Sequence, residues 1–353
     1  MKLTHKLRRS GVAALALAAA IGITGTAHAA TSLVETGSSL LYPLFNLWVP
    51  DFTAANPGIQ LSTTSTGSGA GIAQSIKGLV QIGASDAYLS DGIMKKNPGM
   101  LSIPLAISAQ AINYNLPGLN GKSLKLSGPI LAGIYSGKIT KWNDKAIAAA
   151  NPGVALPDHV IIPVHRVDGS GDTFIFTQYL AFSTPSWAKT VDYGTAVSWP
   201  AVSGGIGANG NSGMVTAVAA NPYSVAYIGV SYAAQVEKAG LGVAALKDKA
   251  GVYVMPTAAN IAAAADSVVT TTPPDERISM IFAPGELAYP IVNYEYAIIN
   301  SAQSDATTAS AVQTFLNWAL TSGNDMKYLS KVHFLPLPAA IVTLSKTQIA
   351  KIH

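Results

Sequence analysis

The stretch VHRVDGSGDTFIFTQYL, Val164 to Leu180, combines a strand, a turn and the start of a helix. Its first residues end the apolar run HVIIPVHR, which is typical of a buried strand. Gly169-Ser170-Gly171 predicts a turn, and the apolar residues that follow recur at helical spacing. The stretch also contains Arg166, one of only two arginines after residue 9. It therefore predicts a strand–turn–helix unit with a rare charged side chain beside the turn.

The same alternation of strands and helices extends along the rest of the chain. VQIGASD (80–86) and AYPIVNYEYAII (288–299) predict buried strands, IAAAAD (261–266) predicts a packed helix, and the Gly- and Ser-rich segment 201–215 predicts a surface loop. Such alternation favours an α/β fold over an all-β sandwich. A chain of 353 residues with 49% hydrophobic content usually divides into two domains.

The N-terminal segment has the features of a secretory signal peptide. An apolar run over 11–23 is shorter than the 20 or so residues that span a membrane, and Ala27-His28-Ala29 offers a small-residue cleavage site. Four basic residues precede this run, namely Lys2, Lys6, Arg8 and Arg9. We therefore expect residues 1–29 to be removed after Ala29 and the mature protein to be periplasmic.

Charge and cysteine content exclude several classes of protein. The formal net charge of +4 comes entirely from the predicted signal peptide, and 18 basic and 18 acidic residues remain after it. Basic residues do not cluster with aromatic ones, so we expect no nucleic-acid partner. The chain has no cysteine, which excludes disulfides, thiolate metal sites and a cysteine-linked lipid anchor.

Three glycine–serine turns precede apolar residues at helical spacing: Gly37-Ser38-Ser39, Gly67-Ser68-Gly69 and Gly169-Ser170-Gly171. A helix N-terminus has free backbone N–H groups and a partial positive charge, and serine can cap it. Glycine lets a ligand approach the backbone closely. One such turn is usually only a cap, but three turns together with Arg166 predict an anion site.

Charged residues near the turns indicate which anion would fit. Arg166 offers a planar fork for a tetrahedral oxyanion, and Asp168 could orient that fork from two residues away. Asp86 would repel an anion unless the ligand carried a proton to donate. Hydrogen phosphate carries such a proton and sulfate does not, so a buried aspartate could discriminate between them.

These motifs resemble the PstS family, the periplasmic phosphate-binding proteins of the high-affinity phosphate ABC transporter. The resemblance extends over essentially the whole mature chain. It implies a two-domain, hinged fold in which each domain is α/β and phosphate is held in the cleft between the domains. The blocks that carry it are ETGSSLLYPLFNLW, TGSGAGIAQSIKG, IGASDAYLS, HRVDGSGDTFIFTQYL and YPIVNYEYAI.

The resemblance also implies a set of ligand-binding residues. Asp172 departs from the family's common Gly-Ser-Gly-Thr pattern, because a carboxylate replaces a hydroxyl donor. It could accept the proton of the ligand or contribute only its N–H. The implied phosphate ligands are Ser39, Leu40, Ser68, Asp86, Arg166, Ser170, Gly171 and, ranked below the others, Asp172, with Asp168 in a supporting role.

The predicted function is a periplasmic receptor that captures inorganic phosphate and delivers it to a membrane permease. The alternatives are a receptor for another oxyanion such as sulfate, which Asp86 disfavours, and a secreted phosphatase-like hydrolase. The scattered histidines lack metal-ligand spacing and no serine has an activating base, so we expect neither a cofactor nor catalysis. We expect a monomer, with one domain formed by 31–106 and 289–353 and the other by 107–288.

Overall fold

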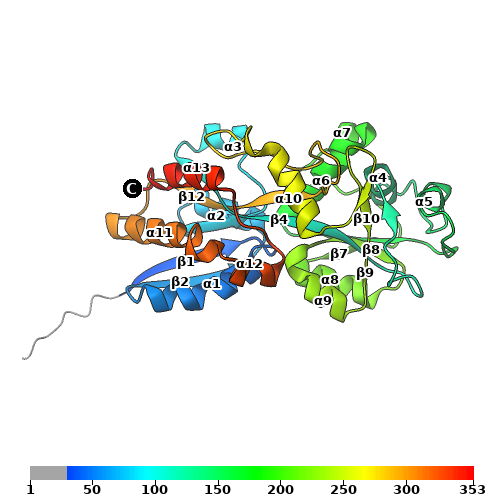
Figure 1. The fold of residues 1–353 in the computed structure, drawn as a ribbon, viewed down its shortest axis with the longest axis horizontal. Helices are drawn as coiled ribbons and strands as arrows, with labels where there is room; N and C mark the ends of the chain where they lie inside the picture. The colour runs from blue at the N-terminus through cyan, green and yellow to red at the C-terminus, as the bar shows by residue number, and fades with distance from the viewer. Residues whose placement is uncertain (1–29) are drawn as a thin grey trace, which may run out of the picture.

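Helices and strands alternate along the part of the chain that the computed structural model describes, residues 30–353. The predicted signal peptide, residues 1–29, lies outside the described residues. Figure 1 shows an elongated molecule in which strands are covered by helices in two halves. No helix within 30–353 combines the length and apolar character that a membrane crossing requires. The α/β class predicted from the sequence is confirmed.

The first half contains one side of the large sheet, in the strand order β2 (Ile59–Ser65), β1 (Thr31–Gly37), β3 (Ile82–Ser85), β12 (Val292–Asn300) and β4 (Met100–Asn115). The strand β1 is parallel to β2 and β3, whereas β12 is antiparallel to β3 and β4. The surrounding helices are α1 (Tyr42–Ala55), α2 (Ser68–Ile76), α3 (Asp91–Lys96), α11 (Ala306–Ala319), α12 (Met326–Leu329) and α13 (Ala339–Ile349).

In the second half the sheet continues from β4 through β8 (Ser224–Gly229) and β6 (Ile162–Arg166) to β7 (Ile206–Ala208), with β9 (Gly242–Val243) beside β4. A small sheet contains β5 (Lys125–Leu126), β10 (Ala245–Lys247) and β11 (Tyr253–Val254). The helices of this half are α4 (Gly128–Tyr135), α5 (Lys145–Ala150), α6 (Gly171–Ser183), α7 (Pro185–Thr190), α8 (Gly210–Ala220) and α9 (Ala233–Lys238). The helix α10 (Ala258–Val269) packs against β12 and β4.

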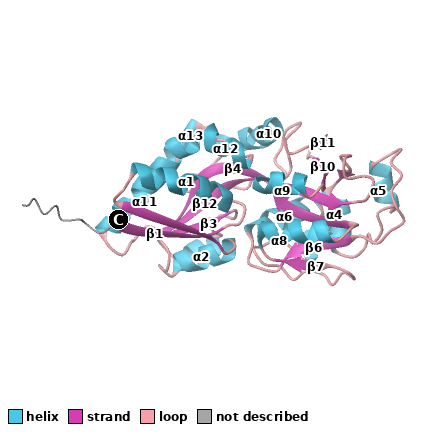
Figure 2. Ribbon diagram, turned by 90° about the horizontal axis from the view of Figure 1, so that it is seen from below, coloured by secondary structure: helices cyan, strands magenta, loops and turns pink. Residues whose placement is uncertain are grey.

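The strand β4 connects the two halves, as Figure 2 shows from below. Its first part, 100–109, pairs with β12, and its last part, 110–115, pairs with β8. All of β4 except its last residue is buried, which explains its long apolar sequence. Because this one strand carries the large sheet from the first half into the second, the facing ends of the two halves are held close together.

The segment 201–215 is not only a surface loop, so this expectation was wrong in part. It contains β7, which pairs in parallel with β6, and the first turns of α8. Gly210 has a φ of 60°, a left-handed conformation that glycine adopts without strain. Gly210 therefore permits the tight turn between β7 and α8, whereas Gly207 and Gly213 lie within these two elements.

Candidate functional site

The three glycine–serine turns meet where the two halves face each other. The strand β1 ends at Gly37, β3 ends just before Asp86, and β6 ends at Arg166. The helices α2 and α6 begin at Ser68 and Gly171. Carboxyl ends of strands and N-termini of helices thus converge, which is the usual position of a ligand site in an open α/β sheet.

Arg166 is only 2% exposed and lies at the centre of a charged network. Its Nε donates to Asp168 Oδ1 at 2.7 Å, and its Nη2 donates to the other oxygen of Asp168. Its Nη1 donates to Asp172 Oδ2 at 2.7 Å and to Ser39 Oγ at 3.2 Å. Asp168 thus holds the guanidinium through both of its oxygens, and one Nη2 hydrogen remains without a hydrogen-bond partner among residues 30–353.

Asp172 is buried, and protein donors occupy both of its carboxylate oxygens. Its Oδ2 accepts from Asn211 Nδ2 at 2.7 Å as well as from Arg166, and its Oδ1 accepts from Gln110 Nε2 at 3.0 Å. Burial raises the pKa of Asp172 although Arg166 opposes this shift. The carboxylate therefore links Arg166 to β4 and α8 through hydrogen bonds.

Ser38 and Ser39 have different roles at the start of α1. Ser38 Oγ accepts from the backbone N–H groups of Leu40 and Leu41, each at 3.0 Å, and donates to Asp86. Ser39 Oγ instead accepts from Arg166 and from both nitrogens of Asn211, at 3.1 and 2.9 Å. The hydroxyl of Ser39 thus reaches the other half of the molecule, while the N–H of Leu40 is bonded locally.

Asp86 is buried beside the N-termini of α2 and α6. Ser68 Oγ donates to its Oδ2 at 3.3 Å, and the Asp86 N–H donates back to Ser68 Oγ at 3.2 Å. A Cβ atom on Gly171 would lie 2.5 Å from Ser68 Oγ and even closer to Asp86 Oδ2. Only glycine at this position lets α6 approach the aspartate so closely.

Ser170 caps α6, because its Oγ accepts from the N–H of Thr173 at 3.1 Å. The turn before it touches the turn before α2, since the N–H of Gly69 donates to the carbonyl of Gly169 at 2.9 Å. Gly67, with a φ of 88°, would place a Cβ atom 2.7 Å from Asp168 Oδ2. The glycines thus allow the two turns to meet across the halves.

The electrostatics of the cluster favour a proton on the carboxyl groups rather than full ionisation. Burial raises the pKa of Asp86 to about 7, and the charge of Asp172 adds to this, while the hydrogen bonds to Glu295 and Ser38 oppose it. Burial also disfavours the charge of Arg166, but Asp168 and Asp172 outweigh burial and raise its pKa. The cation is permanent, and the carboxyl group of Asp86 can exchange a proton near neutral pH.

A pocket of about 410 Å³ adjoins this cluster. Its walls include Ser39, Asp168 and Asn211, together with Tyr42 and Tyr232. It gives the cluster an approach from the surface of the molecule. Within residues 30–353, no group of three histidine, cysteine or acidic side chains is arranged to bind a metal ion.

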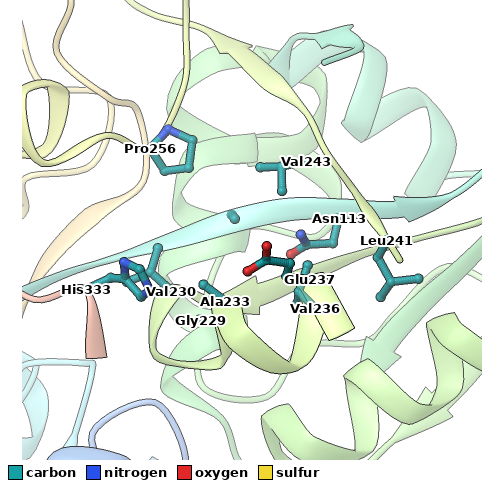
Figure 3. A pocket seen from close by; sticks show the side chains of 11 residues that line it. Asn113, Gly229, Val230, Ala233, Val236, Glu237, Leu241, Val243, Pro256 and His333 are labelled. Atoms are coloured by element: carbon teal, nitrogen blue, oxygen red, sulfur yellow. The ribbon is translucent and has the colours of Figure 1, made fainter. Parts of the chain in front are cut away.

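A second pocket, of about 320 Å³, lies beside β4, β9 and α9 (Figure 3). Its walls are mostly apolar, including Val236, Leu241 and Val243, and Glu237 contributes a carboxylate. An anion would meet apolar surface and negative charge there. The converging serines and Arg166 therefore form the better anion site.

Sequence analysis missed several polar residues of the cluster. Asn211 lies in the segment that was interpreted as a surface loop, and Ser38 could not be distinguished from Ser39 as the cap. Glu295 is the one acidic residue of its buried strand, and that charge was the available signal. The missed residues are Ser38, Gln110, Asn211 and Glu295.

Comparison with known proteins identifies a family and several relatives to which the chain is similar. Residues 24–322 match the family described as a PBP superfamily domain. The phosphate-binding protein PstS of Xylella fastidiosa is 37% identical over 306 residues, which cover 87% of this chain and 81% of that protein. PstS of Methanocaldococcus jannaschii is 34% identical, and the match covers 91% of this chain and 87% of the relative.

Solved structures share the fold at lower sequence identity. The phosphate binding protein of Stenotrophomonas maltophilia has a TM-score of 0.68 and 20% identity, over 90% of this chain and 94% of that chain. The periplasmic phosphate-binding protein PfluDING has a TM-score of 0.70 and 22% identity, over 90% and 93% of the two chains. The predicted two-domain binding-protein fold is thereby confirmed.

Proposed function

The chain belongs to the PBP superfamily and, within it, to the PstS phosphate-binding proteins, and from this premise we propose that it captures inorganic phosphate and delivers it to an ABC-type import permease. The observation that carries the proposal is the buried guanidinium of Arg166, held by Asp168 and surrounded by serines and helix N-termini. A tetrahedral oxyanion suits this combination of a rigid fork and backbone donors.

The proposed ligands are those implied by the resemblance. The remaining Nη2 hydrogen of Arg166 and the hydroxyls of Ser39, Ser68 and Ser170 would donate to phosphate oxygens. The N–H groups of Leu40 and Gly171 would join them. Two donors must first leave a local partner, because Leu40 N–H is bonded to Ser38 and the hydroxyl of Ser68 to Asp86. A ligand that replaced these internal bonds would gain charge-assisted ones, which are roughly twice as strong as neutral ones.

Asp86 would accept a hydrogen bond from the protonated oxygen of the ligand. A carboxylate can accept the hydrogen of hydrogen phosphate, but it meets only lone pairs on sulfate. For Asp172 we propose a different role, because Arg166, Asn211 and Gln110 already occupy its oxygens. Its carboxylate would hold Arg166 in place, and only its N–H, at the start of α6, would donate to the ligand.

The binding event would close one half of the molecule on the other. Ser39 lies in the proposed domain 31–106 plus 289–353, and its partners Arg166 and Asn211 lie in the proposed domain 107–288. A ligand that binds to groups of both domains at once favours the closed form of the protein. The permease would recognise that form. We further propose a monomer that acts in the periplasm, without turnover of its ligand.

Calorimetric titration of the chain from residue 30 with phosphate, sulfate and a phosphate monoester tests this proposal. We expect one phosphate to bind per chain with micromolar or tighter affinity, no measurable heat with sulfate, and no release of phosphate from the ester. Tighter binding of sulfate would identify a receptor for a different oxyanion. Hydrolysis of the ester would identify a phosphatase instead.

A further inference from the structure

Glu295 lies on β12 next to Asp86, and it is fully buried. Asn293 is two residues before it, so both side chains project from the same face of the strand. Asn293 Nδ2 donates to the backbone carbonyl of Asp86 at 3.3 Å and to Glu295 Oε1 at 3.1 Å. The side chain of Asn293 thus fixes the two acidic residues against each other.

The two oxygens of Glu295 have different surroundings. Oε1 accepts from the hydroxyl of Ser108 on β4 and from Asn293. Oε2 is shielded from solvent and has no hydrogen-bond partner among residues 30–353. An ionised carboxylate can only accept hydrogen bonds, so a charge on Glu295 would leave a buried acceptor unsatisfied.

The titratable groups around Glu295 add to the cost of its ionisation. Asp86 is within hydrogen-bonding reach, and its charge disfavours a second negative charge. Arg166 and Asp172 act on Asp86 from the other half of the molecule. No lysine or arginine within residues 30–353 forms an ion pair with Glu295. A proton on Oε2, donated to Asp86, would give this unpartnered oxygen of Glu295 a hydrogen bond.

We propose that Glu295 is a specificity-determining positioning residue, which keeps a proton on Oε2 and donates it to Asp86 so that Asp86 stays an acceptor toward the bound oxyanion. The inference rests on the proposed phosphate function. Because Asp86 accepts this hydrogen bond from Glu295, it takes up a proton of its own less readily. It therefore continues to exclude oxyanions that carry no proton. Burial raises the pKa of Glu295 well above its ordinary value, in agreement with this role.

Two substitutions separate the donated hydrogen bond from the volume of the side chain. Glu295→Met keeps the approximate length but removes the donor, so Asp86 should become protonated more readily and then donate to sulfate. We expect its phosphate-to-sulfate affinity ratio at pH 7 to fall at least about tenfold. Glu295→Gln supplies an amide donor to Asp86 and should restore most of the ratio.

Glu35→Gln is the matched control. Glu35 is also buried in a strand of the sheet, on β1, its carboxyl accepts from Thr63, and burial raises its pKa to about 8. It lies outside the anion cluster, so Glu35→Gln should leave the ratio unchanged. A ratio in Glu295→Met equal to that of the wild type would overturn the inference, and so would an equal loss in Glu295→Gln and Glu295→Met.

Proton counting keeps the test valid if Glu295→Met does not fold. Calorimetry in two buffers of different ionisation enthalpy gives the number of protons exchanged when phosphate binds. We expect the same number in the wild type and in Glu295→Gln at pH 7, because Glu295 is protonated before and after binding. A difference of about half a proton or more would mean that Glu295 ionises, and would overturn the inference. Failure of the wild type to bind phosphate would instead refute the proposed function.

Discussion

Asp168 holds the guanidinium of Arg166 through both carboxylate oxygens, although the two residues are only two positions apart in the chain. This leaves Nη1 and one Nη2 hydrogen directed away from Asp168, and Nη1 already reaches Ser39 in the other half of the molecule. The cation is therefore fixed in orientation before any ligand arrives. Preorganisation of this kind lowers the entropic cost of binding.

Arg166→Ala should weaken phosphate binding by at least about 30-fold in calorimetry, since removing one partner of a desolvated charged pair costs about 2 to 5 kcal/mol. Arg166→Lys should recover only part of the loss, because an ammonium cannot reproduce the fork. Lys141→Ala is the control, because Lys141 forms an exposed ion pair with Asp158. Unchanged affinity in Arg166→Ala would exclude Arg166 from the site.

Asp86→Asn should lower the ratio of phosphate to sulfate affinity at least about tenfold. An amide can donate to sulfate, whereas an unpaired buried acceptor costs about 1 to 3 kcal/mol or more. Asp172→Asn should weaken phosphate binding yet keep the ratio, because the Asp172 oxygens face protein donors. Competition calorimetry of both variants measures this. A ratio that changes only in Asp172→Asn would reverse the roles proposed for the two residues.

Gly171→Ala should abolish tight phosphate binding. The added methyl would collide with Ser68 and Asp86, and it would push α6 away from the turn before α2. Gly58→Ala is a matched control, because a Cβ atom there meets nothing within 4 Å. Phosphate titration together with circular dichroism separates a lost site from a lost fold. Wild-type affinity in Gly171→Ala would show that the close approach is not needed.

The ligand-free protein should be more stable at pH 5 than at pH 8. Burial raises the pKa of Glu35 to about 8, of Asp86 to about 7 and of Glu276 to about 7, so the folded chain binds more protons than the unfolded chain between about pH 4 and 8. The free energy of unfolding therefore falls as pH rises through this window. One pKa unit corresponds to about 1.4 kcal/mol, so we expect Tm to drop by several degrees.

Scanning calorimetry in matched ionic strength checks this prediction. Glu35→Gln removes one of the groups and should reduce the slope of Tm against pH. A Tm that rises from pH 5 to pH 8 would mean that the buried carboxyls are ionised in the folded state.

The sequence predicted the parts of the site that depend on local chain geometry. Arg166, Asp168 and the serine that caps α6 lie within five residues, so a strand–turn–helix pattern was sufficient to bring them together. Asn211 could not be predicted, because its contact with Ser39 spans 172 positions and depends on the pairing of β7 with β6. The glycines near Asn211 also favoured a loop in the sequence, so the start of α8 was not predicted.

Glu295 illustrates a second limit. Its strand was correctly predicted as buried, but a buried strand by itself does not show which side chain it faces. The pairing of β12 between β3 and β4 brings Glu295 close to Asp86 and Ser108. The single acidic residue in an apolar run was visible, whereas its partner was a property of the sheet order.

A crystal structure of the phosphate complex at high resolution is the most direct test of phosphate capture by this cluster. We predict one phosphate between the N-termini of α2 and α6, bonded to Arg166, with one of its oxygens about 2.5 to 2.7 Å from a carboxylate oxygen of Asp86. A phosphate bound elsewhere, or bound at Arg166 with Asp86 out of hydrogen-bonding reach, would contradict the proposal that Asp86 reads the proton of the ligand.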